Sequence, residues 1–71
     1  MKLYLEALET VAEREEAEFI RAEITGKTDN EVATIQSRME DIMVGKHYQL
    51  SKHYCRHEDG GACNTEIITV V

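Results

Sequence analysis

The first part of the chain carries apolar residues at helical spacing. Residues 2–25 contain no glycine or proline, and the helix-favouring residues Ala, Leu, Glu and Arg are abundant there. The apolar positions follow helical spacing along one face, interrupted only at Glu15: Leu5, Leu8, Ala12, Phe19 and Ala22. Gly26 follows as the residue that adopts positive φ just past a helix end. The pattern therefore predicts a helix over residues 2–25.

A second helix is predicted over residues 29–44. Thr28 and Glu31 are spaced as a capping box, in which each side chain satisfies a backbone N–H of the first helical turn. Gly45 ends the segment, and the linker between the two predicted helices is only about three residues long, which favours an antiparallel helical hairpin. The apolar positions of this segment again follow helical spacing: Val32, Ile35, Met39, Ile42 and Met43.

From His47 onward the pattern alternates between apolar and polar residues, as in β-strands. Strands are predicted over residues 47–57 and 62–71, and the Glu58–Gly61 segment between them carries the acidic and glycine residues of a hairpin turn. The expected fold class is therefore α+β: a single domain over residues 1–71 with an antiparallel two-helix hairpin followed by a C-terminal β-hairpin.

The length of the chain limits its core. A domain of 71 residues buries only about 60% of its unfolded surface, so small folds commonly add a disulfide, a metal ion or a partner subunit. The predicted second strand ends in the apolar Ile67–Val71 segment, whose unpaired edge invites strand addition. These features favour self-association, with another protein as the alternative partner.

The charge balance bears on partners and location. The chain has 14 acidic and 8 basic residues, a formal net charge of −6, which disfavours binding to the phosphates of nucleic acids. The acidic first segment leaves open a role as an inhibitor or regulator of a basic partner protein. The sequence shows neither a signal-peptide core nor an apolar run of membrane-spanning length, so a cytoplasmic protein that does not enter membranes is expected.

The second half also contains residues that bind metals. His53, Cys55 and His57 share one face of the predicted strand. A three-residue turn places Cys63 opposite His57, so that Cys55, His57 and Cys63 can converge on a zinc ion. His53 lies about 13 Å from His57 along the strand, which excludes it from the same site unless the strand is bulged. The alternatives are a Cys55–Cys63 disulfide, or two reduced thiols beside solvated histidines.

The sequence provides no acid–base pair or activated nucleophile in a recognisable arrangement. The expected function is that of a small non-enzymatic interaction or assembly module, homo-oligomeric, with no resident cofactor required. The first alternative is a zinc-stabilised binding domain that uses Cys55, His57 and Cys63, and the second is the acidic regulator.

Overall fold

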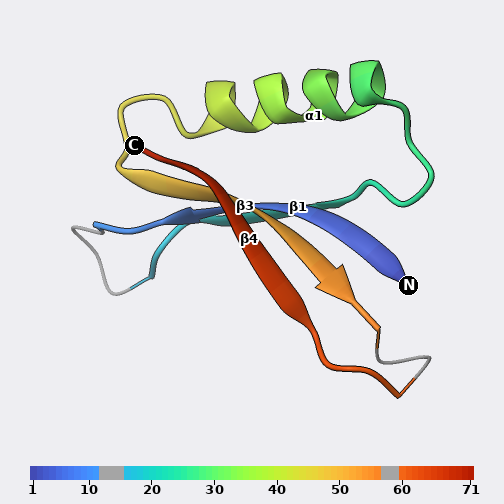
Figure 1. Cartoon of the computed structure of the whole chain (residues 1–71). Coiled ribbons are helices and arrows are strands. Elements are labelled where there is room, and N and C mark those ends of the chain that lie inside the picture. The colour runs from blue at the N-terminus through green and yellow to red at the C-terminus, as the bar shows by residue number, and fades with distance from the viewer. Residues whose placement is uncertain (12–15, 57–59) are drawn as a thin grey trace.

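The fold is a four-stranded antiparallel sheet with one helix lying across it (Figure 1). The structure, a computed structural model, describes residues 1–11, 16–56 and 60–71. Within these residues, the elements in chain order are β1 (Lys2–Glu9), β2 (Phe19–Glu23), α1 (Asp29–Ile42), β3 (Tyr48–Cys55) and β4 (Asn64–Val70). The strand order in the sheet is β2-β1-β3-β4.

The predicted helical hairpin is wrong, because the segment expected to form its first helix is the strand pair β1–β2. Local propensity favours a helix there, but β1 pairs with β3 along its whole length, from Lys2 opposite Cys55 to Glu9 opposite Tyr48. This long-range pairing satisfies the backbone of β1 and overrides the local preference. The fold is therefore mostly β. In chain order, α1 lies between the strand pair β1–β2 and the strand pair β3–β4.

The apolar stripe of the expected first helix is split between the two faces of the sheet. Leu5 and Ala22 lie on the face that α1 covers, and Leu8 and Phe19 lie on the opposite face; Ala12 falls outside the described residues. A strand turns successive side chains to opposite faces, so spacings of three residues cannot stay on one side. The alternation of Leu3, Leu5 and Ala7 was the relevant pattern.

Helix α1 lies within the predicted range, and its predicted capping box is present. The Thr28 hydroxyl accepts a hydrogen bond from the Glu31 backbone N–H at 3.3 Å, and the Glu31 carboxylate accepts one from the Thr28 N–H at 3.1 Å. Met39 and Met43 are buried, whereas Ile42 is 55% exposed, so the face predicted for Ile42 is wrong. Gly45, expected to end the helix, has φ 79° three residues beyond it.

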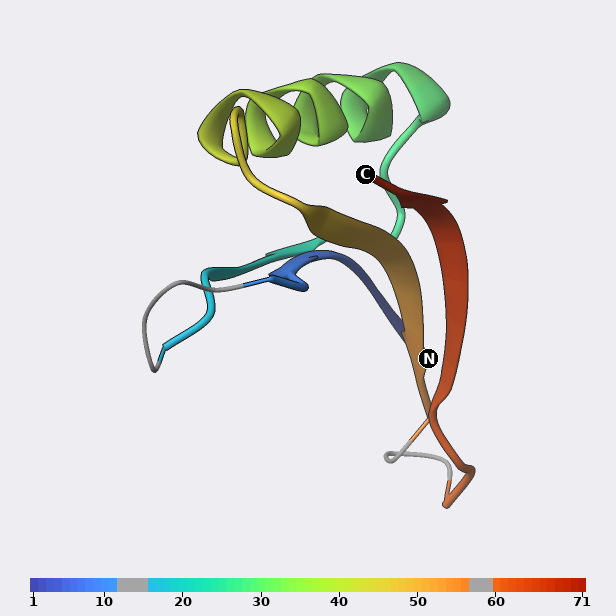
Figure 2. The ribbon, with the colours of Figure 1, turned by 90° about the vertical axis from the view of Figure 1, so that its left-hand side faces the viewer.

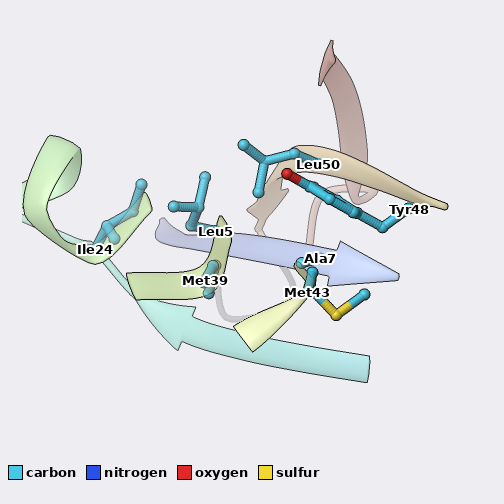
Figure 3. Close-up of a cluster of buried hydrophobic side chains, with 7 residues drawn as sticks. All are labelled: Leu5, Ala7, Ile24, Met39, Met43, Tyr48 and Leu50. Carbon is cyan, nitrogen blue, oxygen red and sulfur yellow. The ribbon is translucent and has the colours of Figure 1, made fainter. Parts of the chain in front are cut away.

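The core lies between α1 and one face of the sheet, and Figure 3 shows its side chains. Strands and helix both contribute, and the segment that connects β2 to α1 supplies one more side chain. Leu3, Ile20 and Val32 pack at the margin. The fully enclosed set is Leu5, Ala7, Ile24, Met39, Met43, Tyr48 and Leu50.

The other face of the sheet is open: no described helix or strand lies against it. We call it the open face. Figure 2 shows that the far half of the β3–β4 hairpin extends away from the layer covered by α1. All residues of β4 are exposed, and its pairing with β3 shifts register between Leu50 and Ser51. Among the described residues, no helix is long and apolar enough to cross a membrane.

Candidate metal centre

Two cysteines face each other at the far end of the β3–β4 hairpin. Cys55 is the last residue of β3, and Cys63 comes directly before β4. His53 pairs with Thr65 and Tyr54 with Asn64, so the same register continued by one residue sets Cys63 opposite Cys55. Opposed residues of an antiparallel pair project to the same face of the sheet. The Cys63 thiol accordingly donates a hydrogen bond to Cys55 Sγ, 3.5 Å away.

His53 completes a group of three metal-binding side chains on the open face. It precedes Cys55 by two residues and therefore shares its face of β3. One ligand atom from each of His53, Cys55 and Cys63 lies within 4.8 Å of the other two. In a tetrahedral zinc site, bond lengths of about 2.0–2.3 Å place neighbouring ligand atoms about 3.5–3.8 Å apart. The group can hold a metal ion after a contraction of about 1 Å.

The histidine of this group differs from the one that the sequence predicted. The predicted set was Cys55, His57 and Cys63, and His57 lies outside the described residues. The register sets Cys63 opposite Cys55, and its predicted pairing with His57 falls on a residue outside the described part of the chain. His53 was expected to join only through a strand bulge, but β3 stays in unbroken register with β1 from Tyr48 to Cys55. His53 and Cys55 are two residues apart on the same face of β3, so their side chains are close enough to share a site without a bulge.

The His53 ring is held by its neighbours on the open face. Nδ1 lies 3.2 Å from the Thr65 hydroxyl, on the residue directly opposite. The Tyr4 ring, on the other side, has its centroid 6.3 Å from the imidazole centroid. With the proton on Nδ1, the ring donates to Thr65 and leaves the Nε2 lone pair for an ion. Hydrogen bonds of this kind orient metal-binding histidines.

A cation–π contact extends this arrangement to β2. The Arg21 guanidinium lies 3.7 Å from the centroid of the Tyr4 ring and pairs with Glu6 at 3.3 Å. This cation–π contact holds the Tyr4 ring next to the His53 imidazole, on the side of the imidazole opposite Thr65. Sequence spacing could not reveal this row of contacts, because Arg21, Tyr4, His53 and Thr65 come from four different strands.

The cysteines are thiols in this structure. Their sulfur separation of 3.5 Å exceeds the about 2.05 Å of a disulfide. Partial burial is the largest cause that raises the pKa of the Cys63 thiol, and the hydrogen bond with Cys55 raises this pKa further. A raised pKa disfavours the thiolate form of Cys63. A bound cation would reverse this preference, because metals bind the deprotonated sulfur.

A second polar group lies on the other face of the same hairpin. The Tyr54 hydroxyl donates to the Glu66 carboxylate at 3.2 Å, and partial burial together with Glu66 raises the pKa of Tyr54. Arg56, Ala62 and Asn64 line the shallow hollow beside this pair. Tyr54 and Glu66 satisfy each other and strengthen the cross-strand contact.

Comparison with known proteins supplies no analogue for this arrangement. No protein-family model matches the chain, and neither a curated protein nor a solved structure gives a significant match.

Proposed function

We propose that the chain is a small, non-enzymatic, zinc-stabilised binding domain whose metal ligands are His53, Cys55 and Cys63. The observation that carries this proposal is the convergence of one imidazole nitrogen and two sulfurs within 4.8 Å. The site replaces the predicted ligand His57 with His53 and keeps both predicted cysteines.

The donor set favours zinc. Thiolate and imidazole are the ligands that dominate zinc sites in proteins, whereas Mg²⁺ and Ca²⁺ prefer oxygen. Zinc takes four ligands, so one further side chain or a water molecule would have to complete the set beside these three.

The position of the site indicates a structural role. The three ligands belong to the end of the hairpin that extends beyond α1, where β4 is exposed along its whole length. Few apolar contacts hold that end, so the ion would supply a cross-link between β3 and β4 that the core does not provide. Ligands that bind only the folded state raise its stability by mass action, by about 4 kcal/mol at a thousandfold excess over Kd.

Metal titration of matched histidine variants tests the proposal. Reduced, chelator-treated protein is titrated with zinc while NMR follows the amide signals of β3 and β4. We expect saturation at one ion per chain, and a loss of affinity of at least about tenfold for His53→Ala.

The control is His47→Ala, an exposed histidine that precedes β3 and is not part of the site. It should bind zinc as tightly as the parent protein. Equal losses in the two variants, or a parent that binds no zinc, would overturn the proposal.

A further inference from the structure

The open face carries an apolar patch at the end opposite the metal site. Leu8 pairs with Phe19 on one side and with Gln49 on the other, and Gln49 pairs with Val70. These four residues form one row across all four strands, about 14 Å wide at the usual strand spacing. Phe19, Leu8 and Val70 are each more than 40% exposed.

The bulge in β4 places Ile67 on the same face, next to this row. Ile67 and Val70 are three residues apart and would project to opposite faces of a regular strand. Because the register shifts between Leu50 and Ser51, Ile67 lies opposite Ser51 and Val70 opposite Gln49, so both project from the open face. We call Leu8, Phe19, Ile67 and Val70 the open-face patch.

The charges of the open face are balanced. Its described strand residues carry two positive and two negative charges, whereas the whole chain has a formal net charge of −6. Two copies would repel each other through most of their surfaces but not through this face. A basic partner would instead be drawn to the acidic regions elsewhere. The four charged residues are Lys2, Glu6, Arg21 and Glu23.

The exposed area also leaves room for a partner. A compact monomer of 8.1 kDa exposes about 4,500 Å². This chain exposes 5116 Å². The excess of about 600 Å² approaches the about 800 Å² that each side of a standard interface buries.

We propose that the open-face patch is the contact surface of a symmetric dimer, in which a second copy of this chain covers it. A twofold axis parallel to the strands places each patch against its counterpart in reversed strand order, so the β2 side of one patch faces the β4 side of the other. The interface extends over the β2-β1-β3-β4 surface rather than along a strand edge. Along β3, the row of Leu8, Phe19 and Val70 lies about 20 Å from Cys55 and Ile67 lies about 13 Å from it, so the dimer does not depend on the metal ligands.

Sedimentation velocity of matched lysine variants tests this proposal. The parent protein should sediment as two copies of the 8.1 kDa chain at tens of micromolar concentration. Leu8→Lys should raise the dimer dissociation constant at least tenfold, because it places an uncompensated charge at the centre of the interface. Circular dichroism verifies that this variant keeps its fold.

Val44→Lys is the control, since Val44 is 77% exposed but lies after α1, away from the open face. It should leave the dimer intact, as should removal of metal with a chelator. A monomeric parent at 100 µM, or equal dissociation of the Leu8 and Val44 variants, would overturn the proposal. Neither result would bear on zinc binding, which is measured separately.

Discussion

The Cys63 thiol lies 3.5 Å from Cys55 Sγ because the two residues oppose each other across the end of the β3–β4 hairpin. They are eight positions apart in the sequence, and the hairpin returns the chain with both side chains on one face. His53 joins them from two residues earlier on β3. The two sulfurs and the His53 imidazole therefore form a candidate metal centre at the end of the hairpin.

Thr65 orients His53, so its removal should weaken metal binding without abolishing it. We expect Thr65→Val to lower zinc affinity about tenfold, because the imidazole loses the partner of Nδ1. Competition with a chromophoric chelator measures the change. Thr69→Val is the matched control on the same strand, since Thr69 pairs with Leu50 on the opposite face. Equal affinities in both variants would exclude the orienting role.

Zinc affinity should depend steeply on pH. Burial raises the pKa of Cys63, so its thiol is protonated at neutral pH and must lose its proton to bind the ion. Each proton released changes the apparent affinity about tenfold per pH unit, so two thiols predict about a hundredfold gain from pH 6.5 to 7.5. Calorimetry in buffers of different ionisation enthalpy counts the protons. A flat profile would show that the thiols are not ligands.

The stability of the metal-free protein should fall as the pH rises, whereas zinc affinity should increase with pH. The folded-state pKa of Cys63 is raised above its unfolded value, so its contribution to stability is complete below the unfolded pKa. That contribution is lost as the pH rises through the folded-state pKa. We expect the melting temperature of chelator-treated protein to fall at alkaline pH, and that of Cys63→Ser to fall less. Urea unfolding at matched pH values checks the difference.

The capping box stabilises the start of α1. Thr28→Ala should lower the free energy of unfolding by about 1 kcal/mol, because the Glu31 N–H loses its acceptor. Thr34→Ala provides the comparison, since Thr34 lies inside the helix and its hydroxyl only donates to the Asn30 carbonyl. It should leave stability unchanged or slightly raised. Equal destabilisation of both variants would contradict the capping role.

Hydrogen bonds from Thr28 lower the pKa of Glu31. The stability that this carboxylate contributes is therefore present above its unfolded pKa and is lost as the pH falls through the folded-state value. Glu31→Gln should reduce the acid-induced part of the stability loss, which unfolding measured between pH 6 and pH 3 detects. An unchanged acid profile would mean that Glu31 titrates equally in both states.

Two adjacent residues at the C-terminal end of α1, Ile42 and the C-cap residue Met43, separate its exposed side from its buried side. Met43 is fully buried against the sheet, so Met43→Ala should lower the free energy of unfolding by about 2–5 kcal/mol. Ile42→Ala removes an exposed side chain and should change it by less than about 0.5 kcal/mol. Denaturant unfolding measures both variants. Comparable losses would mean that the helix is rotated about its axis.

Some elements of this fold could be read from local sequence, and others could not. Thr28 and Glu31 identify the start of α1 because capping depends on residues three positions apart. The strands β3 and β4 lie within their predicted ranges, where β-branched and alternating residues make the pattern local. The pairing of β1 with β3 joins residues 39 to 53 positions apart, which no local pattern contains.

The candidate metal site could be predicted only in part, because local sequence does not contain the strand register. Cys55 and Cys63 were identified by residue type and proximity to the turn. Choosing between His53 and His57 required the strand register, which a change of one residue in the turn would reverse. The sequence alone could not predict that Thr65 orients His53, because this role depends on the cross-strand pairing of the two residues.

Native mass spectrometry shows whether His53, Cys55 and Cys63 together bind one zinc ion. Protein expressed with zinc and purified reduced, without chelator, should carry one zinc ion per chain. The Cys63→Ser variant should carry none while keeping the far-UV circular dichroism of α1. Parent protein that carries no metal and takes up none from added zinc would contradict the account.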